Sequence, residues 1–289
     1  MKAGNIVLIV IFGFILLSGI LFLIYYQSIM WKIYHYPRDN PYNYVKKMKR
    51  KRKTSKKKRI VFIGDSLTHG ILSVNYIEML TKKLGRNYDY INAGMNAELS
   101  YNVLLRIESI IACKPDFLTI LIGTNDANAE IKNVPDKKML EKLNLLGKPN
   151  KKWYIENLEK IITELKEKTD AKIALCSIPI MGEEFSSSAF KQSIDYSKAI
   201  FEIANKHDIN YLPVNEKMIE YLKQHPSTPK YPHEKRLVEE AALKHFLFRK
   251  NFDKLSEEYG FSLLVDHIHI NTEGAKIVAD LMLDFILSK

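Results

Sequence analysis

From residue 59 to the end of the chain, short and almost continuous apolar runs alternate with longer segments in which apolar residues recur every three or four positions. The short runs are rich in β-branched and aromatic residues, which favours strands, and the longer segments have helical periodicity. The predicted strands are RIVFIG (59–64), YDYINAG (88–94), FLTILIGTND (117–126), KIALCSIPI (172–180) and NYLPVN (210–215). The predicted helices lie within 74–85, 100–112, 153–168 and 193–207. Because strands without a polar face must be covered on both sides, this alternation predicts an α/β fold with a parallel five-stranded sheet between helices.

The first hydrophobic segment of the chain, Ile6–Tyr26, has a different pattern, because its 21 residues carry no charge and show no polar face. At about 1.5 Å per residue it is long enough to cross a hydrocarbon core of about 30 Å. It also exceeds the ~7–15 apolar residues of a cleaved signal peptide. We therefore predict one N-terminal transmembrane helix within an anchor segment, residues 1–27, with a cleaved signal as the alternative.

The formal net charge of +11 is concentrated in one run, Lys46–Arg59, which has eleven Lys and Arg residues and no acidic residue. Removing these eleven from the 44 basic residues leaves 33, which equals the number of Asp and Glu residues. A nucleic-acid-binding domain carries its basic charge on the folded surface, so this distribution argues against nucleic acid as a partner. We predict a polybasic juxtamembrane linker, residues 28–58, that is attracted to anionic lipid through 46–59. A solvated spacer is the alternative.

Small polar residues follow the predicted strands at the points where the strands end. GDSLT (64–68) follows the first strand, NAG (92–94) ends the second, GTND (123–126) ends the third, and DHIHINTEG (266–274) precedes the last helix. In a parallel sheet all these ends open on one edge, so residues far apart in the sequence converge there. We therefore expect a site at this edge.

The residue types at that edge fit nucleophilic catalysis. A Ser66 hydroxyl becomes a nucleophile when a base such as His269 removes its proton, and Asp266 is close enough in sequence to orient that histidine. The backbone N–H groups of Ser66 and Gly94 and the side-chain amide of Asn125 are candidate donors to an oxyanion. The competing interpretation is that Asp65 or Ser66 only caps a helix.

In this order, the four segments resemble the SGNH/GDSL hydrolases, a superfamily of serine esterases and lipases, and the resemblance covers residues 59–289. It implies a flavodoxin-like three-layer α/β/α sandwich and no cofactor. It also implies Ser66 as nucleophile, His269 with Asp266 as base and orienting acid, and Gly94 and Asn125 as oxyanion donors.

The chain departs from the pattern of that superfamily at three positions. A second glycine often stands where this chain has Ala97, glycine commonly stands where it has His267, and proline often stands where it has Ile270. No departure removes a reacting group, so we expect differences in loop geometry and not in chemistry.

Other polar residues near the four segments have simpler interpretations. Asp65 and Asp126 are expected to brace Ser66 and Asn125 by hydrogen bonds, and not to act as the paired carboxylates of a glycosidase. His69 is expected to be structural, and no metal site is expected at His267 and His269, because no acidic or cysteine cluster completes a coordination set. The two cysteines lie in apolar runs and are expected to be buried thiols.

The predicted function is therefore a membrane-anchored serine hydrolase that cleaves carboxylic esters, of the esterase, lipase or deacetylase type, through an acyl-enzyme on Ser66. Transfer of the acyl group to a sugar or lipid hydroxyl uses the same residues and is the first alternative. A catalytically silent binding module tethered to the membrane is the second. The ester substrate is a small molecule, a lipid or a glycan. Family habit places the catalytic domain on the extracytoplasmic side, although the local charge count favours the cytoplasm.

Overall fold

The computed structural model describes residues 3–51, 56–131, 145, 148–233, 235 and 237–288. The chain divides into two compact units, Met1–His35 and Tyr36–Lys289.

The first unit is a single helix, α1 (Ala3–Tyr34). Within the part of the chain that the structure describes, its stretch Val10–Tyr34 is the one helix long and apolar enough to cross a membrane. A signal sequence near an N-terminus passes the same test. The helix extends beyond the predicted run at its C-terminal end because no helix breaker occurs between Tyr26 and Pro37.

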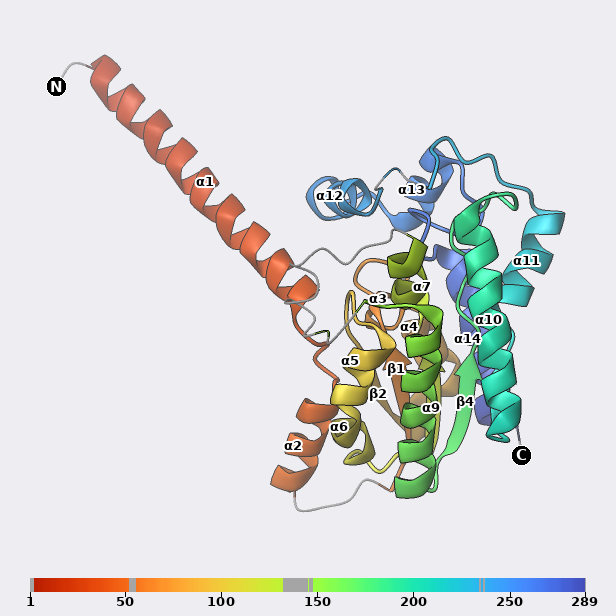
Figure 1. The fold of residues 1–289 in the computed structure, drawn as a ribbon. Helices are drawn as coiled ribbons and strands as arrows, with labels where there is room; N and C mark the ends of the chain where they lie inside the picture. The colour runs from red at the N-terminus through yellow and green to blue at the C-terminus, as the bar shows by residue number, and fades with distance from the viewer. Residues whose placement is uncertain are drawn as a thin grey trace. The chain divides into compact units, whose positions relative to one another are not determined.

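The second unit contains a five-stranded parallel sheet with strand order β2-β1-β3-β4-β5 (Figure 1). The strands are β1 (Lys58–Gly64), β2 (Tyr88–Gly94), β3 (Phe117–Leu121), β4 (Lys172–Cys176) and β5 (Asn210–Leu212). The predicted α/β class with one parallel five-stranded sheet is therefore confirmed.

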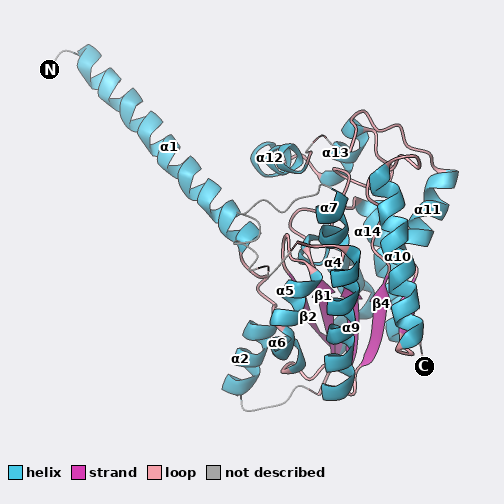
Figure 2. Cartoon of the chain, in the orientation of Figure 1, coloured by secondary structure: helices cyan, strands magenta, loops and turns pink. Residues whose placement is uncertain are grey.

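Helices cover both faces of this sheet, as Figure 2 shows. Their bounds are α2 (Pro41–Lys51), α3 (Ser66–His69), α4 (Tyr76–Leu84), α5 (Ser100–Leu105), α6 (Ile107–Ile111), α7 (Thr124–Ile131), α9 (Lys151–Lys168), α10 (Ser188–Lys206), α11 (Val214–Gln224), α12 (Val238–Phe248), α13 (Phe252–Tyr259) and α14 (Thr272–Leu287), with a short 3-10 helix at Gly85–Asn87.

The core has two halves, one on each face of the sheet, because successive strand residues point to opposite sides. On β1, Ile60 and Phe62 pack into the half covered by α4, α11 and α14. Val61 and Ile63 pack into the half covered by α5, α6, α9 and α10. All four residues are fully buried, which explains the continuous apolar pattern of this strand.

Three strands are shorter than their sequence runs, including β5, which ends at Leu212 and not at Asn215. β3 ends at Leu121, and its GTND segment instead begins helix α7. β4 ends at Cys176, because its partner β5 pairs only with residues 174–176. The polar residues that follow these strands therefore lie in loops or in the first turn of a helix, and not in the sheet.

The segment Tyr36–Lys51 belongs to the second unit, although the predicted linker, residues 28–58, includes it. Tyr44 and Val45 of α2 pack against the half of the core that contains Val61 and Ile63. The Tyr44 hydroxyl donates to Asp89 Oδ2 at 3.0 Å, at the start of β2. Residues 52–55 of the predicted basic run lie outside the described residues. The described part of that run begins as a helix on the folded unit.

The two cysteines, Cys113 and Cys176, are free and buried, as expected. The polar stretch after the fifth predicted strand, residues 223–260, has an amphipathic middle that predicts a helix, and the structure has α12 and α13 there. Most of the polar stretch after the third predicted strand, residues 127–152, lies outside the described residues.

Candidate active site

Ser66 stands at the first position of helix α3, directly after strand β1. Asp65 is the N-cap residue, and its Oδ1 accepts the N–H of Leu67 at 3.0 Å. A side chain at Gly64 would lie 2.6 Å from the carbonyl oxygen of Leu121 on the neighbouring strand. Glycine is therefore required where β1 turns into α3, and the turn presents the Ser66 hydroxyl at the carboxyl edge of the sheet.

Asp266 and His269 lie in the loop before helix α14. Asp266 Oδ1 accepts the backbone N–H groups of Ile268 at 3.1 Å and His269 at 2.9 Å, which fixes the turn. Its other oxygen, Oδ2, lies 2.8 Å from His269 Nδ1. His269 Nε2 lies 2.9 Å from Ser66 Oγ. The structure therefore brings together the three residues that the sequence suggested, and all three are buried.

The charges of this trio are set by opposing effects. Burial alone would raise the pKa of Asp266, but the charge of His269 and the hydrogen bonds from its ring and backbone outweigh burial and lower that pKa. Burial alone would lower the pKa of His269, but the charge of Asp266 and its hydrogen bond raise that pKa above the usual value. Asp266 is thus held as a carboxylate, and the imidazolium of His269 is stabilised.

The backbone N–H of Gly94 already donates a hydrogen bond within the protein, whereas we expected it to be available as an oxyanion donor. It donates to Asn92 Oδ1 at 2.9 Å, and Asn92 Nδ2 in turn donates to the Thr68 carbonyl at 2.9 Å. A Cβ at position 94 would lie 2.3 Å from the backbone nitrogen of His69. Glycine is therefore needed here because α3 packs tightly against β2.

Ala97 lies on the loop that follows β2, and the sequence marked it only as a departure from the superfamily pattern. It is exposed and has φ of +65°, a left-handed conformation that favours glycine. Within the described part of the chain, its N–H donates no hydrogen bond. The signal was present in the sequence, because this is the position where the resembled superfamily often has a glycine.

Asn125 lies in the first turn of α7. Its Nδ2 donates to the backbone carbonyl of Glu98 at 2.9 Å. An amide nitrogen carries two hydrogens, so this bond uses one of them. The bond fixes the Asn125 side chain against the loop that follows β2.

Asp65 and Asp126 are both buried, but each braces a residue other than the expected one. Asp65 caps Leu67, as described, and its Oδ2 has no hydrogen-bond partner among the described residues. Burial raises the pKa of Asp65 to about 7. Asp126 accepts the N–H of Ser100 at 3.0 Å and its hydroxyl at 2.7 Å, and burial raises its pKa to about 6. Asp126 therefore holds the start of α5 and not Asn125.

Two further histidines, His267 and His69, lie close in sequence to the residues of the trio. His267 has φ of +82°, which explains why glycine is common at this position in the resembled superfamily. Its ring packs on Phe261, with the ring centroids 4.8 Å apart. His69 ends α3 and is buried. Among the described residues, no group of three or more His, Cys, Asp or Glu side chains is arranged to hold a metal ion.

Glu183, in the loop after β4, is a positioning residue that the sequence reasoning missed. Its buried carboxylate accepts three backbone N–H groups, from Ser262 at 2.8 Å, Leu263 at 2.7 Å and Leu264 at 2.8 Å. These residues lead directly into Asp266. Backbone donors have no side-chain signature, so only the acidic pair at 183–184 was visible in the sequence.

Comparisons with known proteins concern the family and the fold of the chain. A family model described as the GDSL-like lipase/acylhydrolase family matches residues 62–277. The crystal structure of the acetyl xylan esterase AlAXEase is similar, with 18% identity, a TM-score of 0.57, and coverage of 79% of this chain and 100% of that chain. Axe2, an acetylxylan esterase from Geobacillus stearothermophilus, has 19% identity, a TM-score of 0.55, and coverage of 80% and 95%. A variant of Axe2 has 20% identity, a TM-score of 0.57, and coverage of 80% and 94%. These structures share the fold. No curated protein sequence matches the chain.

Proposed function

We propose, on the premise that the chain belongs to the GDSL-like lipase/acylhydrolase family and is an ester-hydrolysing enzyme, that it cleaves carboxylic esters through an acyl-enzyme on Ser66. The observation that carries this proposal is the continuous hydrogen-bonded chain from Ser66 Oγ through His269 to Asp266, with distances of 2.9 and 2.8 Å.

In the proposed reaction, His269 Nε2 takes the Ser66 proton while Oγ attacks the ester carbonyl carbon. The imidazolium then gives that proton to the leaving alcohol oxygen as the carbon–oxygen bond breaks. Water, deprotonated by His269, attacks the acyl carbon. The bond between that carbon and Ser66 Oγ then breaks as the imidazolium returns the proton to Oγ, which releases the carboxylic acid and restores the serine. Asp266 keeps the imidazole in the required tautomer and stabilises its charged form.

The oxyanion of each tetrahedral intermediate needs fixed hydrogen-bond donors. We assign this role to the Ser66 N–H, at the open N-terminal turn of α3, and to the Asn125 amide. The N–H of Ala97 is the third candidate, because the N–H of Gly94 is engaged by Asn92. Gly94 contributes a donor only in a state where the Asn92 side chain turns away.

The substrate class to test first is a short acyl ester of a carbohydrate, because the similar structures named above are acetylxylan esterases. Lipid esters and small esters are the next classes. The same residues transfer an acyl group if a sugar or lipid hydroxyl replaces water. Detection of an acylated acceptor would assign transfer, and carboxylic acid release without acylated acceptor would assign hydrolysis.

We further propose that α1 anchors the protein in a membrane by a single span, with the catalytic unit on the extracytoplasmic side. The described side chains from Val10 to Tyr26 include many large apolar groups that the protein leaves exposed. Where the membrane contains anionic lipid, its headgroups would attract the basic residues of 46–59. Protease accessibility of the catalytic unit in sealed vesicles tests the orientation.

The test of the catalytic assignment uses the full chain in detergent and the Ser66→Ala and His269→Ala variants. Wild-type protein is expected to react with a fluorophosphonate probe and to hydrolyse an acetyl ester, and both variants should lose turnover while remaining folded. Ser186→Ala, which changes an exposed serine, is the control and should keep both activities. Full turnover by Ser66→Ala would refute the acyl-enzyme assignment.

A further inference from the structure

Arg106 is a buried cation outside the catalytic trio, and it contacts both strands that lead into the site. It lies between α5 and α6, and its guanidinium donates to the Ala93 carbonyl at 2.7 Å and to the Gly64 carbonyl at 3.5 Å. Gly64 is the last residue of β1, and Ala93 precedes the last residue of β2. Arg106 therefore connects the two strand ends from which Ser66 and the following loop emerge.

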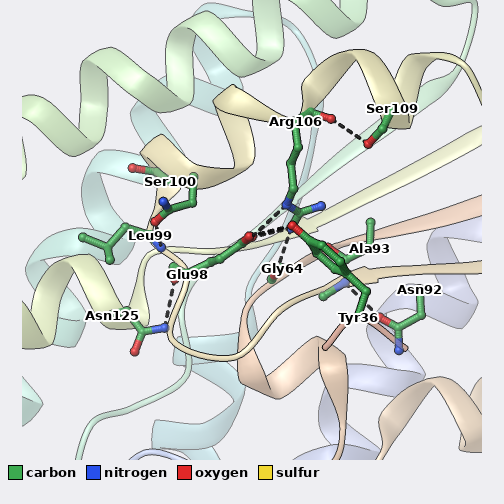
Figure 3. A network of polar contacts seen from close by, with 12 residues as sticks. Tyr36, Gly64, Asn92, Ala93, Glu98, Leu99, Ser100, Arg106, Ser109 and Asn125 are labelled. Carbon is green, nitrogen blue, oxygen red and sulfur yellow. Dashed lines mark hydrogen bonds and ion pairs between the residues drawn. The ribbon is translucent and has the colours of Figure 1, made fainter. Parts of the chain in front are cut away.

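Glu98 neutralises this cation and also holds Asn125. Its carboxylate accepts from Arg106 Nε at 2.8 Å and lies 2.7 Å from Arg106 Nη2, with both residues buried. Its backbone carbonyl accepts from Asn125 Nδ2. Figure 3 shows Glu98 between Arg106 and Asn125. One residue thus joins the buried ion pair, through its side chain, to the proposed oxyanion donor, through its backbone.

Tyr36, which precedes Glu98 by 62 positions in the sequence, is the third member of this network. Its hydroxyl donates to Glu98 Oε1 at 3.2 Å, and its ring centroid lies 5.6 Å from Arg106 Cζ, within the range of a cation–π contact. Burial and the charge of Glu98 raise the pKa of Tyr36 to about 12, so the hydroxyl keeps its proton and remains a donor. In the sequence, Tyr36 follows the end of α1 at Tyr34 by two residues.

We propose that Tyr36, Glu98 and Arg106 are positioning residues for the esterase reaction, and that they connect the segment next to the membrane anchor to the oxyanion donor Asn125. Glu98 is the central residue of the three, because a shift of its carboxylate also shifts its backbone carbonyl, which holds the Asn125 amide. The segment after α1 is therefore a functional part of the catalytic unit, in addition to being its tether. This inference rests on the proposed function.

The first variant is Tyr36→Phe in the full-length protein in detergent, because it removes one hydroxyl and keeps the ring. A displacement of about 1 Å in a catalytic group can cost ~10²-fold in rate, and we expect a smaller loss, about tenfold in kcat, with KM changed less than about twofold. Tyr42→Phe is the matched control. Tyr42 is exposed, and its ring lies 6.0 Å from that of Tyr36, so its kcat should equal that of the wild type.

A double-mutant cycle separates positioning from general destabilisation. If Tyr36 acts through Asn125, adding Tyr36→Phe to Asn125→Ala should change kcat by less than about twofold, although it costs about tenfold alone. Glu98→Gln should show the same non-additivity. If Glu98→Gln does not fold, the cycle of Tyr36→Phe with Asn125→Ala still tests the positioning role.

Equal losses from Tyr36→Phe in both backgrounds would overturn the inference, and so would no loss from the single variant. Ser66→Ala, measured in parallel, distinguishes this result from failure of the proposed function. An active Ser66→Ala would overturn the catalytic assignment on which the inference rests. An inactive Ser66→Ala with additive effects of Tyr36→Phe would overturn the positioning role alone.

Discussion

The hydroxyl oxygen of Ser66 lies 2.9 Å from Nε2 of His269, although 203 positions separate the two residues in the chain. Ser66 is held by the turn after β1, and His269 is held by the turn before α14. Each turn is fixed by an aspartate that accepts backbone N–H groups, Asp65 in the first and Asp266 in the second. The distance between the reacting atoms therefore depends on two short turns and on the packing of α14 against the sheet.

The pH dependence of ester hydrolysis should report the environment of His269. Its pKa is raised, chiefly by Asp266 and in part by the charge of Asp65. The protonated imidazole cannot act as a base, so kcat/KM should rise with pH, with a midpoint above the ordinary histidine value of about 6.5. Asp65→Asn removes the negative charge that Asp65 acquires as pH rises through its pKa of about 7. This destabilises the imidazolium, so the midpoint should move to lower pH.

Asn caps a helix as well as Asp, so the α3 turn should persist in this variant. The measurement is kcat/KM for a neutral ester between about pH 5 and 9. An unchanged or higher midpoint in Asp65→Asn would show that the charge of Asp65 does not act on His269.

Glu183→Gln should destabilise the loop that leads into Asp266. The substitution places an amide N–H₂ against backbone N–H donors and removes hydrogen bonds to a charged group, each worth about 1.5–3 kcal/mol. We expect the free energy of unfolding to fall by about 2–3 kcal/mol, together with a lower kcat. Denaturant unfolding and steady-state kinetics measure the two effects.

Glu184→Gln is the matched control, because its side chain is the exposed neighbour of Glu183. Its stability should stay within about 0.5 kcal/mol of the wild type. Equal effects of the two substitutions would mean that the contacts of Glu183 with residues 262–264 do not contribute.

A chain that begins at Tyr36 should be more stable than one that begins at Arg59. The longer chain keeps Tyr44 and Val45 against the core and the hydrogen bond of Tyr44 to Asp89. Loss of this partial burial and of the hydrogen bond should cost about 2–4 kcal/mol. Urea midpoints of the two proteins provide the comparison, and equal midpoints would argue against a stabilising role for residues 36–51.

Ala97→Gly should stabilise the loop after β2. Ala97 has φ of +65°, where a non-glycine residue carries a penalty of roughly 1 kcal/mol. The backbone N–H is retained, so kcat should not fall. Ala112→Gly is the contrasting control, because Ala112 has φ of −61° and should lose about 0.5–1 kcal/mol. A loss of stability in Ala97→Gly would show that its methyl group makes contacts worth more than the strain.

Much of the site could be predicted from the sequence because its geometry follows from topology. The apolar runs predict parallel strands, and parallel strands place their carboxyl ends at one edge. The segments around Ser66, Asn125 and Asp266 were therefore expected to meet. Asp266 and His269 are three residues apart, so their pairing is also a local property of the sequence.

The tertiary structure alone decided the contacts that involve backbone groups and packed surfaces. Asn92 occupies the N–H of Gly94, Glu183 binds three N–H groups about 80 positions away, and Tyr36 docks on Glu98. Backbone N–H and C=O groups are the same at nearly every position, so no sequence pattern marks which of them a side chain will bind.

The composition of residues 36–51 also does not reveal that this segment belongs to the folded unit. Its charge is typical of a solvated tether, and Tyr44 and Val45 are two residues of α2 that pack against the core. Whether two such residues pack depends on a complementary surface, which here is formed by β2, α6 and their neighbours. The sequence by itself thus determined the fold class and the edge at which Ser66, Asp266 and His269 meet. The tertiary structure decided where the folded unit begins and which groups hold the reacting atoms in place, because these depend on surfaces formed by residues distant in the chain.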